Sequence, residues 1–581
     1  MRIDKSLHPR PQFCRDEWMS LDGIWTCHIP RRPMCYRRKR PDSEIVLSKG
    51  FEDEIRVPFA PGTPASGLPV KEIVDTIYYH RKLSSPAQWA GRRLLLHFGA
   101  VFYHAEVFID GQPVGFHDGG SSSFCLDVTE PLGDCREHDL VVKATANLQD
   151  GSIPSGKQSS YVSSYGCYYQ RTTGIWQTVW LEPVSQTSLD SILMVWSEAA
   201  SSIILTPRFR GPLDGGMRFE VEVGNACPPV SCPACDGQNL VIRIAKPRLW
   251  WPGKPHLYDI TLKLKDADGG LLDNVSSYFG LRTVEIHDGF VYINGRKLYQ
   301  RLVLDQGFYP EGNWTSPSDA ALERDIRLSM SAGFNGARLH QKVFEEKFLY
   351  QADRLGYIVW AESPSWGLDC NDAGLPARNF LCEWREIVER DRNHPSIITW
   401  TPLNETWDVE DALAHRRLHR DAYMLTKDLD PTRPVNDASG YIHFVTDLWT
   451  VHDYEQDPPR LAQQLAGRYV RFPDYEKPEP GQPYLIDEFG GIRWDPKALR
   501  DRDNLSSWGY GNSPAGVEEY FERLRGLVDS VLANPDICGY CYTQLTDVEQ
   551  EKNGVYYYDR RRKFDSKRFR AIFSRKPEGF I

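Results

Sequence analysis

From about residue 286 onward, short apolar runs alternate with amphipathic segments of helical length. Eight of the runs read as buried strands: Leu298–Leu304, Gly336–His340, Tyr357–Glu362, Ile397–Asn404, Pro434–Ala438, Trp449–His452, Tyr484–Glu488 and Ile537–Gln544. The helical candidates between them are Pro317–Ala332, Glu345–Leu355, Asn379–Arg392, Asp408–Asp428 and Ala515–Ala533. We expect Ser316 to cap the first helix, and short or irregular helices after strands five and six. Such alternation predicts a (β/α)8 barrel over residues 286–581.

Two of these strands end in a glutamate. The run from Ile397 ends at Asn404-Glu405, and the run from Tyr484 ends at Glu488, before two glycines. The C-terminal ends of the strands form the catalytic face of a (β/α)8 barrel. Two facing carboxylates there suit a glycosidase, which needs one acid/base and one nucleophile. The alternative, a carboxylate that caps the following helix, fits one such residue better than two.

The first 285 residues indicate an all-β structure. Residues 1–185 contain short strands separated by turn signals, with a hairpin signal at Asp110-Gly111, and predict a β-sandwich of the jelly-roll type. Residues 186–285 contain cleanly alternating strands and predict a small two-sheet sandwich. With the barrel, these make three domains, as expected for 581 residues.

The composition excludes some classes of protein. A net charge of −10 and a pI near 5.9 argue against a nucleic-acid partner. No apolar run approaches the ~20 residues of a membrane span, and the first residues lack the apolar core of a signal peptide. The 13 cysteines are scattered, which suits reduced thiols in a cytoplasmic protein. We therefore expect a cytoplasmic protein without a membrane partner.

Specific motifs resemble a known family. Segments 391–405 and 484–491 resemble the acid/base and nucleophile signatures of glycoside hydrolase family 2, which includes β-galactosidases, β-glucuronidases and β-mannosidases. Motifs in the first 285 residues resemble the family's sugar-binding and immunoglobulin-like domains and its junction into the barrel: Leu21–Trp25, Gly174–Gln177, Trp250-Trp251-Pro252 and Phe279–Arg282. The resemblance implies a jelly roll (1–185), an immunoglobulin-like sandwich (186–285) and a catalytic barrel (286–581), with Glu405 as acid/base and Glu488 as nucleophile of a retaining reaction.

The resemblance also implies substrate-binding residues. Tyr454 matches the tyrosine beside the nucleophile, Asn404 the contact to the sugar 2-hydroxyl, and Arg338 and His340 the pair that faces the pocket. By position at strand ends or in pocket-side loops, we add Asp305, His452, Trp494, Trp508, Gln544 and Lys552. Capping by Asp305 and loop packing by either tryptophan are the alternatives.

The favoured function is a retaining exo-β-glycosidase that removes a terminal β-galactoside or β-hexuronide. A catalytically inactive carbohydrate-binding protein and a transglycosylase with the same two carboxylates are the alternatives. Strand eight carries Tyr542-Thr543-Gln544 where better-known family members carry a tryptophan, and Lys552-Asn553 reverses their uronate-binding order. These departures leave the sugar open. We expect a carbohydrate partner and no metal or cofactor. A homo-oligomer is compatible with the sequence.

Overall fold

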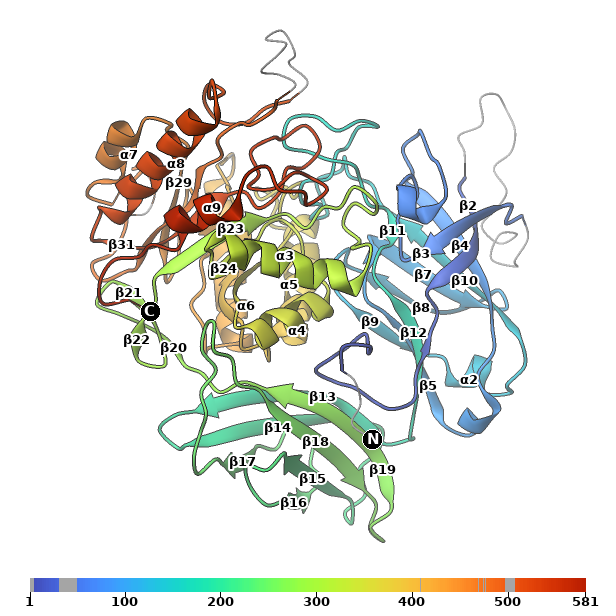
Figure 1. Cartoon of the computed structure of the whole chain (residues 1–581). Helices are drawn as coiled ribbons and strands as arrows, with labels where there is room; N and C mark the ends of the chain where they lie inside the picture. Colours follow the sequence, from blue (N-terminus) through green and yellow to red (C-terminus); the bar gives the residue numbers. More distant parts are fainter. Residues whose placement is uncertain are drawn as a thin grey trace.

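The computed structural model describes residues 5–30, 50–407, 409–468, 470–473, 475, 477–496 and 507–580. A barrel (yellow-green to red in Figure 1) lies against a jelly roll (blue to cyan) and a second β-sandwich (green). The basic run Arg31–Arg40, for which a solvated loop is our prediction, lies outside the described residues. The fold class predicted from the sequence is confirmed.

The barrel is a curled parallel sheet. Seven strands pair in the order β26-β25-β24-β23-β31-β30-β29. Their bounds are β23 Gln300–Asp305, β24 Gly336–Leu339, β25 Ile358–Glu362, β26 Ile397–Thr401, β29 Trp449–Asp453, β30 Tyr484–Gly490 and β31 Ile537–Thr543. The remaining strand, β28 (Ala438–Ser439), pairs with β27 (Leu403–Asn404), which continues β26, and Trp400 bridges to Val435. The eight predicted strands therefore all appear, in the predicted order.

Helices cover the outside of the barrel. They are α3 Asp319–Ala332, α4 Glu346–Leu355, α5 Leu375–Asp391, α6 Ala412–Leu429, α7 Pro458–Leu465, α8 Val517–Leu532 and α9 Ser566–Phe573. The helix after strand six, α7, is short, as expected. Residues 440–448 after strand five hold no helix, where we expected a short or irregular one. The cap of α3 is a correction: Ser318 accepts from the Ala321 N–H, whereas Ser316 donates to the Ser318 carbonyl. None of the helices in the described part of the chain combines the length and apolar character needed to cross a membrane.

The jelly roll consists of two main sheets around one apolar core. One sheet has the order β1-β12-β5-β9 and the other β3-β2-β4-β10-β7-β8, and β6 pairs with β11. Their bounds are β1 Met19–Ser20, β2 Gly23–His28, β3 Asp53–Val57, β4 Thr76–Leu83, β5 Arg93–Phe98, β6 Val101–Phe102, β7 His104–Ile109, β8 Gln112–Asp118, β9 Phe124–Asp127, β10 His138–Thr145, β11 Gly174–Ile175 and β12 Val179–Val184. Alternating inward residues such as Val107, Leu140 and Val142 are fully buried between the sheets. This period of two is what the sequence showed.

The second sandwich also has two sheets, β13-β14-β17 and β16-β15-β18-β19. Their bounds are β13 Ser188–Ser197, β14 Ser202–Arg210, β15 Arg218–Val223, β16 Val230–Pro233, β17 Leu240–Arg243, β18 Tyr258–Lys265 and β19 Leu271–Phe279. A small sheet, β20 Val284–His287, β21 Phe290–Ile293 and β22 Arg296–Lys297, leads into the barrel. Domain boundaries near residues 185 and 285 remain our proposal; the first falls between β12 and β13, and the second falls within β20.

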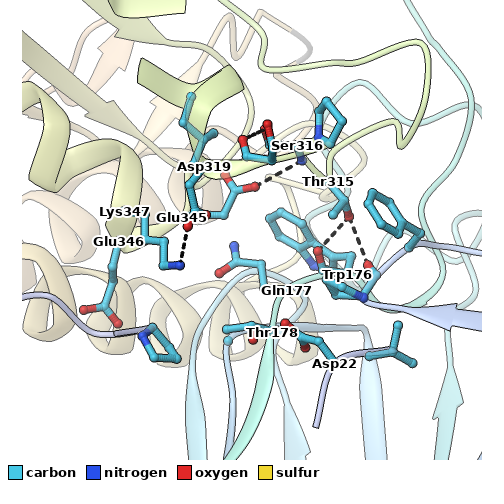
Figure 2. Close-up of a pocket in the computed structure, with 18 of the residues that line it drawn as sticks. Asp22, Trp176, Gln177, Thr178, Thr315, Ser316, Asp319, Glu345, Glu346 and Lys347 are labelled. Carbon is cyan, nitrogen blue, oxygen red and sulfur yellow. Dashed lines mark hydrogen bonds and ion pairs between the residues drawn. The ribbon is translucent and has the colours of Figure 1, made fainter. Parts of the chain in front are cut away.

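A cavity of about 420 Å³ lies where the jelly roll meets α3 and α4. Figure 2 shows the side chain of Gln177 between the Asp319–Lys347 ion pair of the barrel and Trp176 of the jelly roll. Thr315 donates to the Trp176 carbonyl (2.7 Å) and so fixes the two domains at this point. Neither Glu405 nor Glu488 lines this cavity. It is a feature of the domain interface, distinct from the site described below.

Buried Arg15 ties the two sandwiches together. Its Nη1 donates to Glu182 on β12 (2.7 Å), and its Nε and Nη2 donate to both oxygens of Asp273 on β19 (2.9 Å each). Burial alone would raise the pKa of Glu182, but the charges of Arg15 and His97 hold that pKa well below its usual range. Glu182 is therefore ionised in a dry environment, and both buried side chains depend on the guanidinium for their hydrogen bonds.

We predict that Arg15→Ala lowers the free energy of unfolding by about 3–5 kcal/mol, because it leaves two buried carboxylates without their cation. Urea denaturation followed by tryptophan fluorescence measures the change. Arg210→Ala is the matched control, since its ion pair with Asp190 lies on the surface (30% and 42% exposed); we expect about 0–1 kcal/mol there. Equal losses in the two variants would contradict the assignment.

Candidate active site

Glu488 lies at the C-terminal end of β30 and is 5% exposed. Its Oε1 accepts from Arg338 Nη1 (2.8 Å), and its Oε2 accepts from the Tyr454 hydroxyl (2.5 Å). β30 is buried on both faces, so its side chains are fixed by packing. Both oxygens of the carboxylate are thus held by donors that favour its ionised form.

Glu405 follows β27 and has a backbone φ of +48°. This left-handed conformation costs a residue with a Cβ about 1–2 kcal/mol. The Glu405 N–H donates to the Ser439 carbonyl (3.0 Å), and the carboxylate Oε1 lies 2.7 Å from His452 Nδ1. The strained turn therefore aims the side chain back over the barrel mouth instead of along the strand.

His452 lies between the two glutamates, with its Nδ1 2.7 Å from Glu405 and 3.5 Å from Glu488. One ligand-type atom from each of Glu405, His452 and Glu488 lies within 4.8 Å of the other two. In retaining glycosidases the two carboxyl groups lie about 5–5.5 Å apart, whereas inverting enzymes leave about 6.5–9.5 Å for a water molecule. The approach of one oxygen from each carboxylate to within 4.8 Å is compatible with the retaining class.

The same three residues form the one group in the described part of the chain that could hold a metal ion. Both ring nitrogens of His452 are already engaged: Nδ1 lies against Glu405, and Nε2 lies 2.9 Å from the Ser439 hydroxyl. A metal would have to displace these hydrogen bonds. The donor set suits acid–base chemistry without it.

The surrounding charges shift the pKa values of Glu488 and His452 in opposite directions. Burial alone would raise the pKa of Glu488, but the charges of His452 and Arg338 outweigh it and hold that pKa well below its usual range. Burial would lower the pKa of His452, but the carboxylates of Glu488 and Asp487 outweigh it and raise that pKa. The site therefore keeps an ionised carboxylate at Glu488 and favours the imidazolium form of His452.

Arg338, at the end of β24, is fully buried and anchors the floor of the site. Its Nε donates to Glu362 Oε2 (2.6 Å), its Nη1 to Glu488 and to the Asp487 carbonyl (3.1 Å), and its Nη2 to Asn404 Oδ1 (2.6 Å). The Nη2 atom also lies 2.9 Å from His340 Nδ1. Burial lowers the pKa of His340 well below its ordinary value, and its Nδ1 lies at the same distance, 2.9 Å, from Glu362 Oε1. One planar fork thus fixes residues from strands two, three, four and seven.

Asn404 shows an unused donor. Its oxygen is bound by Arg338, which fixes the orientation of the amide, while its Nδ2 is buried and has no hydrogen-bond partner among the described residues. A buried amide donor without an acceptor costs free energy that a ligand oxygen could recover. This fits the expected contact from Asn404 to a sugar hydroxyl.

Tyr454 connects the nucleophile position to the far wall. Its hydroxyl contacts Glu488 and, at 2.9 Å, the Thr543 hydroxyl at the end of β31. Its ring stacks on Tyr510 with centroids 3.5 Å apart, and Trp508 packs edge-on against Tyr510 at 5.6 Å. Trp508 also donates to the Gly166 carbonyl of the jelly roll (2.7 Å).

The structure brings together six of the predicted side chains with Glu405 and Glu488 or with their direct partners: Arg338, His340, Asn404, His452, Tyr454 and, through Tyr510, Trp508. Gln544 lies further along the same rim and bonds to Gln306 (2.7 Å) and Asn553 (2.8 Å). These residues line one mouth of the barrel.

Two predicted residues lie elsewhere. Asp305 caps its own turn by accepting from the Gly307 N–H (3.0 Å). Burial, and after it the negative charge of Asp325, raises the pKa of Asp305 to about 6. Trp494 is 8% exposed and packs on Tyr520 of α8 and on Phe564, in the core outside the strands. For these two residues the structure favours the capping and packing alternatives. The Lys552 N–H donates to the Trp508 carbonyl (2.8 Å), so its backbone lies beside the site, and its binding role stays a prediction.

Sequence reasoning missed two contributors to the site. Glu362 ends β25 and binds Arg338, and a third glutamate at a strand end was a usable signal. Lys157 comes from the loop after β10, where no motif marks it, yet its charge is among those that lower the pKa of Glu488. Trp366, which donates to the Asn404 carbonyl (3.3 Å), completes this side.

Comparisons with known proteins identify related families and chains. The family model "Glycosyl hydrolases family 2" matches residues 227–282, and the model of that family's TIM barrel domain matches residues 284–492. The chain is 25% identical over 443 residues to a β-galactosidase of Thermoanaerobacter pseudethanolicus (74% of this chain) and spans about half, 55%, of its length. It is 24% identical over 567 residues to a β-glucuronidase of Felis catus, covering 85% of this chain and 81% of that one.

Solved structures match over nearly the whole chain. A β-glucuronidase from Ruminococcus gnavus in complex with D-glucuronic acid superposes with a TM-score of 0.78 at 18% identity, covering 98% of this chain and 99% of that one. A β-galacturonidase from Eisenbergiella tayi superposes with a TM-score of 0.73 at 21% identity, covering 98% of both chains. The chain therefore belongs to glycoside hydrolase family 2, and its class is that of the glycoside hydrolases.

Proposed function

We propose that the chain is a retaining exo-β-glycosidase that hydrolyses a terminal β-linked sugar by double displacement. The observation that carries the proposal is the approach of Glu405 and Glu488, whose nearest oxygens lie within 4.8 Å at the catalytic face of a barrel. Relatives named as β-galactosidases and β-glucuronidases, and a structural neighbour named as a β-galacturonidase, favour a β-galactoside or a β-hexuronide as substrate.

In the first step, ionised Glu488 attacks the anomeric carbon while Glu405 donates its proton to the glycosidic oxygen, and the bond to the aglycone breaks. Arg338 and Tyr454 hold the two oxygens of Glu488 in place, so the nucleophile needs little reorganisation. The product is a covalent glycosyl-enzyme with inverted configuration.

In the second step, ionised Glu405 takes a proton from water, whose oxygen attacks the anomeric carbon and releases Glu488. His452, 2.7 Å from Glu405 and 3.5 Å from Glu488, lies between the two carboxylates and can stabilise whichever one carries the negative charge. The second inversion restores the original configuration.

We predict distinct defects in Glu405→Ala and Glu488→Ala on nitrophenyl β-glycosides. Loss of general acid–base catalysis in the first should lower kcat/KM by about 10²–10⁴-fold, with a smaller loss for activated leaving groups. Loss of the nucleophile in the second should lower it by about 10⁴-fold or more for every leaving group. Added azide should give a β-glycosyl azide with Glu405→Ala and an α-glycosyl azide with Glu488→Ala, because it enters from opposite faces.

Glu410→Ala, an exposed glutamate five residues from Glu405, is the control and should keep wild-type rates. Undiminished hydrolysis in either active-site variant, or the same azide product from both, would refute the assigned roles.

Tyr454→Phe tests the support of the nucleophile. The lost hydrogen bond stabilises the ionised form of Glu488, so its removal raises the pKa of that carboxyl. The acidic limb of the pH profile of kcat/KM should move to higher pH by about 1 unit. Tyr556→Phe, which removes a hydroxyl bound to Ser331 (3.0 Å) and the Leu328 carbonyl, is the control. An acidic limb that stays in place or moves to lower pH would contradict the role.

A further inference from the structure

The loop of residues 147–173, between β10 and β11 of the jelly roll, reaches the catalytic face of the barrel. Its first half is fixed to the loop after β25. The Ser155 N–H donates to the Trp366 carbonyl (2.7 Å), and the Gly156 N–H donates to the Pro364 carbonyl (2.9 Å). Gly156 has a φ of +59°, and a Cβ there would lie 2.4 Å from the Gln341 carbonyl oxygen. The backbone therefore passes too close to the barrel for any other residue.

The second half of the same loop is fixed to the opposite side of the barrel mouth. The Gly166 carbonyl accepts from Trp508 Nε1 and from Gln550 Nε2 (2.7 Å each). The Tyr169 hydroxyl donates to Glu551, which follows β31. The loop thus spans the mouth between two anchored ends and is part of the site.

Lys157 lies next to the first anchor and is 9% exposed. Its Nζ lies 5.1 Å from the ring centroid of Trp366, and the indole of Trp366 donates to the Asn404 carbonyl. The ammonium is therefore on the side of the site from which Glu405 projects. Burial would lower the pKa of Lys157, but nearby groups, Cys167 first and then the carboxylates of Glu551, Glu488 and Glu405, outweigh it and raise that pKa.

No described residue accepts a hydrogen bond from Lys157 Nζ or forms an ion pair with it within 4.0 Å. The side chain is largely buried, so an occupant of the site that accepts a hydrogen bond from the ammonium would recover the free-energy cost of its partial desolvation. The ring of Trp366 recovers part of that cost through a cation–π contact but supplies no lone-pair acceptor for the ammonium protons.

The other buried cations near the site are satisfied within the described part of the chain. Arg338 donates to four acceptor groups, as given above. Lys342 Nζ donates to the carbonyls of Gly307 (3.0 Å) and Trp314 (2.6 Å). Lys563 pairs with Asp547 (2.5 Å). Among these cations, only Lys157 has no hydrogen-bond acceptor among the described residues.

We propose that Lys157 is a specificity-determining residue that binds the carboxylate of the substrate sugar, so that the enzyme acts on β-hexuronides. This inference rests on the proposed glycosidase function. A uronate carboxylate supplies the anion and the acceptor that the ammonium lacks, with a charge-assisted hydrogen bond stronger than one to a hydroxyl. It also enters a site that contains ionised Glu488, and the ammonium offsets the repulsion between the two anions.

The test compares 4-nitrophenyl β-D-glucuronide and β-D-galacturonide with the corresponding β-D-glucoside and β-D-galactoside. The readout is the ratio of kcat/KM for each uronide to that for its neutral counterpart. We expect wild type to favour a uronide, and Lys157→Met to lower that ratio by about 100-fold. The ratio cancels any general effect of the lost charge on Glu488. Lys157→Arg should retain much of the preference, and Lys254→Met, an exposed lysine, should leave the ratio at the wild-type value.

A wild-type preference for the neutral sugars, or a ratio unchanged by Lys157→Met, would overturn the inference. The proposed function survives that result if Glu405→Ala and Glu488→Ala remain defective, and fails independently if they do not. If wild type hydrolyses none of the four substrates, calorimetry with D-glucuronate, D-galacturonate, D-glucose and D-galactose decides the inference. Uronate-selective binding that Lys157→Met abolishes supports it, and equal binding of acid and neutral sugars rejects it.

Discussion

The site depends on the guanidinium of Arg338. Its planar set of donors reaches Glu362, Glu488 and Asn404 from one buried position, so three side chains from separate strands acquire fixed relative orientations. A buried arginine is tolerated only when its donors are satisfied, and here the acceptors are the functional groups themselves. The same hydrogen bonds therefore stabilise the barrel interior and fix the geometry of the catalytic face.

That arrangement separates the electrostatic environments of the two glutamates. Glu488 is enclosed by donors on both oxygens, whereas Glu405 is carried by a left-handed turn and touches the site through His452. Two carboxylates close together tend to share one proton, and the better-stabilised member keeps the negative charge. The difference in hydrogen bonding is a physical reason for the division between nucleophile and acid/base.

The jelly roll contributes to the barrel mouth as well as to the outer wall. Its 147–173 loop is bonded to the segments after β25 and after β31, and it carries Lys157 into the field of both glutamates. Arg15 and Thr315 fix the jelly roll to its neighbours at other points. Rigid docking of this domain is therefore a condition for a fixed arrangement of groups at the site.

The sequence predicted the eight barrel strands because apolar runs with sharp polar ends report burial directly, and Glu405 and Glu488 stood at two of those ends. Helix starts were less well predicted. Ser316 and Ser318 are both of a residue type that can cap a helix, and only the path of the backbone makes Ser318 the cap. Trp494 looked like a pocket residue because its loop follows β30, but the loop turns its ring onto α8. Lys157 could not be predicted, since its position depends on docking between domains, which local pattern does not encode.

The most direct test of the central claim is to trap the covalent intermediate. A 2-deoxy-2-fluoro β-glycoside of the preferred sugar with an activated leaving group should form the glycosyl-enzyme faster than water removes it. Mass spectrometry of the digested protein should then find one added fluorosugar on the peptide that contains Glu488, and none in Glu488→Ala. A label on any other residue, or inactivation without a covalent adduct, would contradict the account.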